Sequence, residues 1–352
     1  MNVLMVGVDA STRGGMWTVV ENYLKAPEFI RETHLTYIPT SIAGNPVRKI
    51  LFTAKAFRKI RRVFASTPVD LLHVHMSERG SVYRKGLIMR QAKKHGAKVL
   101  LHMHGAEFEV WYRGLSAGKQ KQVREIVDSA DGILILGEYW NDFMASLVSD
   151  PRKIRVVHNA VAIPEQPLYC AESRKLLFLG AVSRRKGIYD LLDAMAQIRT
   201  ALDPAWTLEI YGPDVIGNIE EEIEKRQLTG RVRYCGWLAP EQRSGVLAQT
   251  AVNLLPSYNE GLPMTIMEAM AAGIPSITTR VAAIPEAVNE ENGVLLEPGD
   301  VQALGQSILT LCGDAELRQR MSRCCCETAR EKFALDVHIR RIQSIYRELL
   351  EK

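Results

Sequence analysis

Two glutamates stand eight positions apart in the stretch PSYNEGLPMTIMEAMAAG. Proline suits the first turn of a helix, so the sequence predicts a helix that begins at Pro263 and ends at Gly273. Glu260 then lies in the loop before this helix, and Glu268 lies inside it among small and apolar residues. A carboxylate in such surroundings needs hydrogen-bond donors. The hydroxyl groups of a ribose or another sugar would supply them.

The loop between the two glutamates adds a possibility for anion binding. The letters EGLP place free backbone N–H groups at the predicted helix N-terminus, where phosphate oxygens bind. Two carboxylates beside an anion site suit a ligand with both phosphates and hydroxyls, such as a nucleotide sugar. The alternative is a structural helix with one exposed and one ion-paired glutamate, and the spacing alone does not separate the two interpretations.

A basic loop follows another predicted strand in the sequence GAVSRRKG. It carries Arg184, Arg185 and Lys186, and a helical pattern comes directly after it. Parallel sheets bind ligands in the loops that follow their strands. Three cations there would neutralise a departing diphosphate. The plainer alternative is a solvated basic turn.

Two H-x-H pairs lie on predicted strands. Each pair places both of its rings on one face of its strand, so adjacent strands would gather His73, His75, His102 and His104 into one cluster. Such a cluster is either strand-end packing or a zinc site, although no cysteine lies nearby. His104 differs from the others because it ends its strand and precedes Gly105.

The elements that must position these residues alternate between strand and helix, which is typical of parallel sheets covered by helices. The runs NVLMVGV, LLHVH, KVLLHMH and ADGILILG precede a proline-containing break at residues 160–173. The runs KLLFLG, TLEIYG, RVRYCGW and VNLLPS follow it, and the chain ends in a helical pattern. This order favours two α/β domains over a single large sheet.

The glutamate motif resembles the E-x7-E signature of the retaining glycosyltransferases of the GT4 family, which have the GT-B fold. The resemblance covers nearly the whole chain, including VGVDASTRGGM, LHMHGAEF, LFLGAVSRRKGIYDLLDA and ENGVLLEPGD. It implies two Rossmann-like domains that face each other across a cleft. The N-terminal acceptor-binding domain would span residues 1–163 and the C-terminal donor-binding domain residues 164–335. A last helix, residues 336–352, would pack back on the N-terminal domain.

The resemblance also implies roles for individual residues. Glu260, His104 and Lys186 would be catalytic, with Glu260 and His104 facing the transferred sugar. Glu268 would bind the ribose hydroxyls of the nucleotide. The other donor-binding residues would be Gly261, Leu262, Pro263, Met264, Arg184, Arg185, Gly14 and Gly15.

The chain departs from the family pattern at two positions. The family carries an arginine where this chain has Ala181, so Arg184 or Arg185 would have to supply that cation. The family often has Asn-Gly where this chain has Asn159 followed by Ala160, which alters the expected tight turn.

The activity implied is transfer of a hexose or N-acetylhexosamine from a UDP- or GDP-sugar to an acceptor hydroxyl, with a lipid-linked saccharide of polysaccharide biosynthesis as the expected acceptor. The family mechanism lets the donor phosphate take the acceptor proton, so we expect no cofactor and no metal. A nucleotide-sugar epimerase and a non-catalytic nucleotide-sugar-binding protein stay open as alternatives. GVDASTRGGM lacks the G-x-G-x-x-G spacing of an NAD-dependent dehydrogenase.

A basic stretch, Val47 to Phe64, has seven basic residues and no acidic one. Helical spacing would place one set of its apolar residues on a common face: Ile50, Ala54, Phe57, Ile60 and Phe64. Such a helix either packs on the core with a solvated basic side or docks on anionic lipid. No nucleic-acid-binding module is evident, so we expect no nucleic-acid partner.

The composition agrees with a cytoplasmic chain that can attach peripherally to the inner face of a membrane. No apolar run reaches the roughly 18 residues of a membrane span, and the first residues lack the basic start of a signal peptide. The six cysteines have no C-x-x-C spacing, so we expect them to be reduced.

Overall fold

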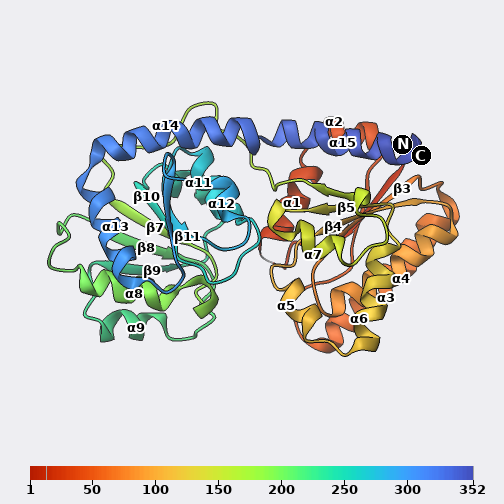
Figure 1. Ribbon diagram of the computed structural model, residues 1–352, viewed down its shortest axis with the longest axis horizontal. Coiled ribbons are helices and arrows are strands. Elements are labelled where there is room, and N and C mark those ends of the chain that lie inside the picture. Colours follow the sequence, from red (N-terminus) through yellow and green to blue (C-terminus); the bar gives the residue numbers. More distant parts are fainter. Residues whose placement is uncertain (13, 352) are drawn as a thin grey trace. The chain divides into compact units, whose positions relative to one another are not determined.

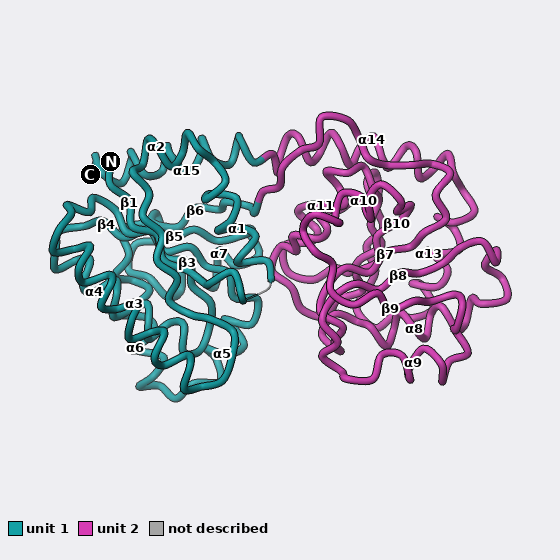
Figure 2. The backbone as a smooth tube through the Cα atoms, turned by 180° about the vertical axis from the view of Figure 1, so that it is seen from behind, with its two compact units in different colours: residues 1–159, 335–352 teal, residues 160–334 magenta. Residues whose placement is uncertain are grey.

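The computed structural model describes residues 1–12 and 14–351 and divides the chain into two compact units (Figure 1, Figure 2). Unit 1 comprises residues 1–159 and 335–352, and unit 2 comprises residues 160–334. Each unit contains one six-stranded parallel sheet with helices packed around it. The α/β prediction is therefore confirmed, and the alternative of a single large sheet is wrong.

The sheet of unit 1 has the strand order β2-β1-β3-β4-β5-β6. Its central strands are continuous apolar runs because helices cover both faces of the sheet, and β1 and β3 are buried along their whole length. The strand bounds are β1 Val3–Gly7, β2 Thr36–Pro39, β3 Leu71–Met76, β4 Lys98–Met103, β5 Gly132–Ile135 and β6 Ile154–Val156.

The helices of unit 1 include the last helix of the chain, α15, so both chain ends belong to this unit (Figure 2). The hydrogen bonds that anchor α15 include Tyr346 to His73 at 2.6 Å and His338 to Tyr23 at 2.7 Å. The bounds are α1 Gly15–Leu24, α2 Pro27–Thr33, α3 Pro46–Ser66, α4 Gly80–Lys94, α5 Phe108–Arg113, α6 Ala117–Asp128, η1 Glu138–Trp140, α7 Asn141–Ala145, η2 Pro151–Lys153 and α15 Leu335–Glu351.

The basic stretch forms α3, but its expected apolar face is split in the structure. Ile60 and Phe64 are buried together with Ala56, whereas Ile50 is 69% exposed and Ala54 is also exposed. The prediction that these apolar residues share one buried face is therefore wrong for the first turns of α3, because from Pro46 to Lys55 only Phe52 and Thr53 are even half-buried.

The sheet of unit 2 has the strand order β12-β11-β10-β7-β8-β9. Its strands are β7 Lys175–Leu179, β8 Thr207–Tyr211, β9 Val232–Gly236, β10 Val252–Leu255, β11 Ser276–Thr279 and β12 Gly293–Leu296. Its helices are η3 Arg184–Lys186, α8 Ile188–Gln197, α9 Ile219–Lys225, η4 Pro240–Gln242, α10 Arg243–Leu247, α11 Met264–Ala271, α12 Ile284–Ala287, α13 Val301–Gly313 and α14 Ala315–Lys332.

Each sheet has one point where the strand order reverses. In unit 1 it lies between β1 and β3, and in unit 2 between β7 and β10. Open parallel sheets bind ligands beyond the carboxyl ends of the strands at this point. The loops that follow these four strands are therefore the first places to look for a site.

Candidate active site

In unit 2, the loop after β7 presses against the loop after β10. Gly187 has a φ of 73°, and a Cβ at this position would overlap the carbonyl oxygen of Pro256. Only glycine therefore allows both the left-handed backbone and the close approach. The contact brings Lys186 next to the loop that carries Glu260.

Glu260 is buried, with 5% of its surface exposed, and two donors bind the same carboxylate oxygen. Lys186 Nζ lies 2.5 Å and Ser257 Oγ 2.7 Å from Oε1. Arg185 Nη1 lies 3.7 Å from the other oxygen, Oε2. The structure thus brings together two of the sequence-predicted residues, Glu260 and Lys186, and adds Ser257, which sequence reasoning missed.

The two arginines of the basic loop point to different neighbours. Arg185 donates from Nη1 to the carbonyl oxygen of Asn259 at 2.6 Å, within the loop of Glu260. Arg184 instead stacks on the ring of Tyr189, with its guanidinium carbon 4.6 Å from the ring centroid. Arg185 is therefore the arginine that lies beside Glu260 and Lys186.

Glu268 lies on the inner part of α11, where one of its two carboxylate oxygens is paired. Arg243 Nη1 donates to Oε1 at 2.6 Å, whereas Oε2 is buried with no hydrogen-bond partner among the described residues. Burial raises the pKa of Glu268, and the charge and hydrogen bond of Arg243 only partly oppose this effect. The carboxylate is thus short of one or more donors.

Two further buried polar atoms near this carboxylate have no partner in the described part of the chain. They are Arg243 Nε and the Oγ1 of Thr265, which precedes Glu268 by almost one helical turn. Buried polar atoms are normally paired, so each exception needs an explanation. Arg243 was not predicted because nothing in its local sequence marks it; only its contact with Glu268 identifies it.

The start of α11 differs by one residue from the prediction. Pro263 has an extended backbone, with φ −66° and ψ 125°, and is the N-cap rather than the first helical residue. No side chain caps this end, so the segment from Gly261 to Met264 brings uncapped backbone to the loop of Glu260. The helix ends at Ala271, and Gly273 turns the chain away with a φ of 80°.

In unit 1, the corresponding sheet edge carries His104, Gly14 and Gly15. His104 follows β4 and its backbone N–H donates to the carbonyl oxygen of Met76 at 2.7 Å. Gly14 and Gly15 are exposed at the start of α1, and Gly14 has a φ of 149°, with no atom of the other described residues within 4 Å of where its Cβ would lie. Backbone conformation, rather than crowding, is what favours glycine at Gly14.

The four histidines form the expected cluster because β3 and β4 are adjacent and His75 lies opposite His102. His75 Nδ1 and His104 Nε2 are 2.9 Å apart, and His73 Nε2 and His102 Nδ1 are 3.3 Å apart. Burial lowers the pKa of all four, to about 3 for His73 and His104. At neutral pH the cluster is therefore an uncharged, hydrogen-bonded stack.

The zinc alternative requires ring nitrogens that converge on one point. One nitrogen each of His73, His75 and His102 lies within 4.8 Å of the other two. The His73 ring is nearly parallel to the rings of His75 and His102, with interplanar angles of 23° and 13°. In-plane lone pairs of stacked rings run in near-parallel planes, an arrangement that favours packing over shared ligation.

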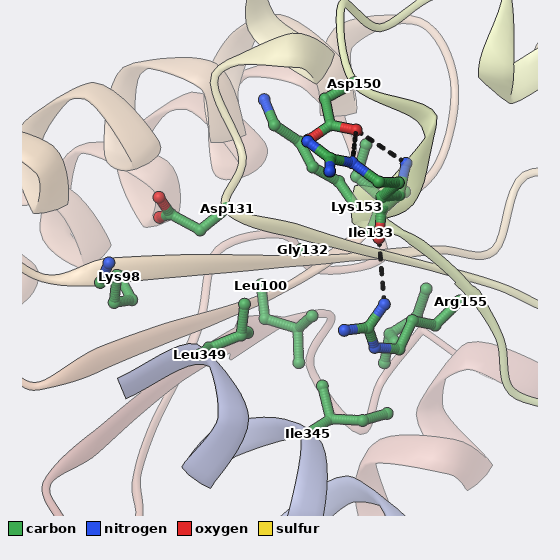
Figure 3. Close-up of a pocket in the computed structure, with 12 residues that line it drawn as sticks. Lys98, Leu100, Asp131, Gly132, Ile133, Asp150, Lys153, Arg155, Ile345 and Leu349 are labelled. Atoms are coloured by element: carbon green, nitrogen blue, oxygen red, sulfur yellow. Dashed lines mark hydrogen bonds and ion pairs between the residues drawn. The ribbon is translucent and has the colours of Figure 1, made fainter. Parts of the chain in front are cut away.

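A pocket of about 440 Å³ in unit 1 lies elsewhere, at the amino-terminal ends of β4 to β6 (Figure 3). Its floor includes Leu100, Ile345 and Leu349. Most of the charged side chains at its rim form ion pairs: Arg152 with Asp150, Lys153 with Asp128, Arg155 with Glu348 and Lys93 with Asp131. Because this edge is opposite the one where open sheets bind ligands, we place the site elsewhere.

Two family descriptions match the chain. Residues 173–314 match glycosyl transferases group 1, and residues 14–160 match the glycosyl transferase 4-like domain. N-acetyl-alpha-D-glucosaminyl L-malate synthase of Bacillus anthracis is 24% identical over 83% of this chain and 78% of that protein. O-antigen chain mannosyltransferase B of Escherichia coli is 27% identical over 57% of this chain and 56% of that protein.

Solved structures match over the whole length. Sucrose-phosphate synthase from Thermosynechococcus elongatus has a TM-score of 0.81 at 19% identity, covering 99% of both chains. HepE of Anabaena, solved in complex with UDP, has a TM-score of 0.76 at 16% identity, covering 99% of this chain and 100% of that chain. At these identities the likeness establishes a shared fold.

Proposed function

The chain belongs to the GT4 family of glycosyltransferases and has the GT-B fold, and from this premise we propose that it is a retaining enzyme. It transfers a hexose or N-acetylhexosamine from a UDP- or GDP-sugar to an acceptor hydroxyl. Unit 2 binds the donor and unit 1 binds the acceptor. The expected acceptor is a lipid-linked saccharide of polysaccharide biosynthesis.

The unpaired oxygen of Glu268 carries this proposal. Oε2 is buried near two other polar atoms that have no partner among the described residues, Arg243 Nε and Thr265 Oγ1. A nucleotide ribose offers hydroxyls that both donate and accept, so it can pair with all three kinds of atom. The complex of HepE with UDP supports a uridine nucleotide as the first donor to test.

The cations beside Glu260 suit the departing diphosphate. Lys186 and Arg185 approach from the β7 loop, and the uncapped start of α11 adds backbone N–H groups and the positive end of the helix dipole. Glu260 holds a hydroxyl of the transferred sugar, and Lys186 balances its charge. With this positive charge in place, we propose that the transfer needs no divalent metal and no other cofactor.

His104, Gly14 and Gly15 contribute from unit 1. His104 is neutral at pH 7 because its pKa lies near 3, so it serves as a hydrogen-bond partner for the sugar rather than as a cation. Gly14 and Gly15 allow backbone to approach the ligands. The proton of the acceptor hydroxyl passes to the donor phosphate, and no protein nucleophile forms a covalent bond.

The acceptor side of the proposal includes peripheral docking on an anionic membrane surface through α3. Among the described residues, no helix combines the length and apolar composition that crossing a bilayer requires. Three large apolar side chains, Val47, Ile50 and Leu51, are 59–69% exposed near the start of α3. None of its seven basic side chains has an ion-pair partner in the described part of the chain. Exposed apolar residues among free cations suit an interfacial helix of a cytoplasmic enzyme.

Flotation with liposomes tests this docking. The wild type should float with vesicles of anionic lipid and much less with neutral vesicles, since each basic residue contributes about 1 kcal/mol near an anionic surface. A variant with glutamine at all seven basic positions of α3 should stay in the soluble fraction. Equal flotation of both proteins would remove the membrane surface from the proposal.

A donor screen tests the transfer itself. UDP- and GDP-sugars should stabilise the protein against heat according to their affinity, and one of them should release its nucleotide faster when saccharide acceptors are added. NMR of the product should show the anomeric configuration of the donor, and EDTA should not reduce the rate. Conversion of the donor without any acceptor would instead indicate an epimerase, and no binding by any donor would indicate that the nucleotide-sugar site is not functional.

A further inference from the structure

Hydrogen bonds to two neighbouring elements fix the backbone around Ser257, in the loop after β10. Its N–H donates to the carbonyl oxygen of Leu255 at 2.9 Å, and its own carbonyl oxygen accepts from Oγ1 of Thr279 at 2.5 Å. The next residue, Tyr258, donates from its N–H to the carbonyl oxygen of Arg185 at 2.8 Å. Ser257 and Thr279 are both buried. The position of Ser257 is therefore set by β11 on one side and by the loop after β7 on the other.

The hydroxyl of Ser257 and the ammonium of Lys186 bind the same oxygen of Glu260. Ser257 Oγ donates to Oε1 at 2.7 Å, and Lys186 Nζ donates to it at 2.5 Å. Among the described residues these are the hydrogen bonds that the carboxylate accepts, since Arg185 Nη1, 3.7 Å from Oε2, is beyond hydrogen-bond distance of that oxygen. A carboxylate oxygen offers two lone pairs. Oε1 is therefore fully used within the protein, whereas Oε2 keeps its lone pairs for a ligand.

Of these two donors, Ser257 is the one that can decide which oxygen of Glu260 it binds. The ammonium of Lys186 is a compact charge on a flexible stem, so it can pair with either oxygen of a carboxylate. The hydroxyl of Ser257 is one carbon away from a backbone that is held in place, so its direction is restricted. The bond from this hydroxyl to Oε1 therefore fixes the carboxylate in one orientation, with Oε2 on the side away from Ser257.

We propose that Ser257 is a positioning residue for the sugar transfer. It holds the Glu260 carboxylate so that Oε2 accepts a hydrogen bond from one hydroxyl of the transferred sugar, and Thr279 holds the backbone of Ser257. The inference rests on the proposed function and deepens it, because it requires a donor sugar with a free hydroxyl at the ring position that Oε2 meets. Misplacing a group that orients a reactant by about 1 Å can cost about 10²-fold in rate, so the loss of this support should be measurable.

Kinetics of Ser257→Ala test the proposal with the donor that the wild type converts fastest among UDP-glucose, UDP-galactose, UDP-N-acetylglucosamine and GDP-mannose. The variant should lose about tenfold or more in kcat/KM for this donor. Its affinity for the matching nucleotide, UDP or GDP, should equal that of the wild type, because the nucleotide alone has no sugar for Glu260 to hold. Ser276→Ala is the matched control and should keep its activity. Ser276 is also buried and is hydrogen-bonded to Asn253 Nδ2 at 3.0 Å, but it lies at the opposite end of β11 from Thr279.

Variants of Thr279 keep the test decisive if Ser257→Ala does not fold. Thr279→Val removes the hydroxyl that holds the carbonyl oxygen of Ser257 and should lower kcat/KM about threefold. Thr279→Ser keeps the hydroxyl and should have a kcat/KM close to that of the wild type. Thr278→Val is the control on the same strand, because Thr278 Oγ1 donates to the carbonyl oxygen of Leu255 instead, at 2.8 Å. This control should lower kcat/KM less than Thr279→Val does.

Deoxy analogues of the converted donor separate positioning from a general loss of structure. Among analogues that each lack one sugar hydroxyl, one should be a much poorer donor than the others for the wild type. Ser257→Ala should discriminate against that analogue less than the wild type does, because the sugar hydroxyl and Ser257 act through the same carboxylate and their losses are not additive. A purely structural role of Ser257 would instead lower the conversion of every analogue by the same factor.

Equal kcat/KM for the wild type and Ser257→Ala would overturn the proposal, as would equal losses in Ser257→Ala and Ser276→Ala or unchanged discrimination among the deoxy analogues. Failure of the wild type to bind or convert any of the four donors would count against the proposed function instead. Urea unfolding of Ser257→Ala, Glu260→Ala and the double variant tests the contact in either case, and the losses of stability should not be additive. Additive losses would show that Ser257 does not hold Glu260.

Discussion

At the carboxyl edges of the two sheets, buried carboxylates in unit 2 have partners of opposite charge, but two cations of unit 1 lack them among the described residues. In unit 2, each buried carboxylate of the site has a cation beside it: Lys186 for Glu260 and Arg243 for Glu268. In unit 1, Lys85 and Arg84 have no carboxylate partner among the described residues, and all eight histidines of the chain belong to this unit. At the first edge both carboxylates are ion-paired and Oε2 of Glu268 is buried without a donor among the described residues, whereas the second edge has cations without a carboxylate partner. The difference supports our proposal that the nucleotide sugar binds at the edge of unit 2.

The largest expected effect is a difference between the two units in how much stability they lose at low pH. The pKa is lowered from 6.5 to about 3 for His73 and His104 and to about 4 for His338. The unfolded chain therefore binds more protons below pH 6.5, and the stability of unit 1 falls as the pH decreases towards 3. Each such histidine costs about 1.4 kcal/mol per pH unit in this range.

Hydrogen exchange at pH 7.5 and pH 5, corrected for the intrinsic pH dependence of exchange, measures this difference. Amides of β3 and β4 should lose protection at pH 5, while those of β7 and β10 in the histidine-free unit 2 should keep theirs. If the amides of β7 and β10 lost more protection at pH 5 than those of β3 and β4, the proposed difference between the units would be wrong.

The second effect is on catalysis. Lys186→Met should reduce kcat by about 10²–10³-fold, the cost typical of losing one group that stabilises charge in a transition state. Lys175→Met is the matched control, because Lys175 also pairs with a buried carboxylate of unit 2, Glu209 at 3.1 Å, but lies at the other end of β7. A similar loss of activity in both variants would mean that Lys186 acts through stability alone.

The third effect is a gain in stability. Lys85→Met should raise the free energy of unfolding by about 1–4 kcal/mol, because methionine fills a similar volume without the buried charge. The pKa of Lys85 falls from 10.5 to about 7 on folding, so the penalty is complete below pH 7 and disappears above pH 10.5. Urea unfolding at pH 6.5 and pH 9.5 should give the larger gain at pH 6.5. A destabilised variant at both pH values would show that Lys85 is already compensated in the free protein.

The smallest effect distinguishes the two arginines of the basic loop. Arg185→Gln should lower kcat/KM about tenfold, since hydrogen bonds of charged groups contribute about 1.5–3 kcal/mol and this side chain is partly exposed. Arg184→Gln should have an effect of about twofold or less, because Arg184 stacks on Tyr189 instead. Steady-state kinetics with varied donor concentration checks the order, and the reverse order would assign the diphosphate contact to Arg184.

Patterns local in sequence predicted much of the fold. The long apolar runs became β1, β3, β4, β5, β7, β8, β9 and β10, because buried parallel strands read as continuous apolar segments. The short strands β2, β6, β11 and β12 were not identified. Length does not separate them from β5 and β10, which also have four residues. β2, β6 and β12 lie at sheet edges and are only partly buried, and β11 has a single apolar residue, Ile277.

The sequence predicted only those features of the site that depend on residues close to one another along the chain. The spacing of Glu260 and Glu268 indicated a loop position and a helix position, which the structure confirms. The partners Arg243 and Ser257, and the uncompensated cations of α4, depend on tertiary contacts that no local motif encodes. The roles of the predicted residues stay predictions until donor and acceptor binding are measured.

The most direct test of the central claim is a thermodynamic cycle on the unpaired oxygen of Glu268. Titration calorimetry compares UDP and 2′,3′-dideoxy-UDP on the wild type and Glu268→Gln, with Glu209→Gln as a buried, ion-paired control in the same unit. The account predicts that removing the ribose hydroxyls or changing Glu268 each weakens binding about tenfold or more, that the two losses are not additive, and that Glu209→Gln binds UDP normally. Additive losses, or normal UDP binding by Glu268→Gln, would contradict it.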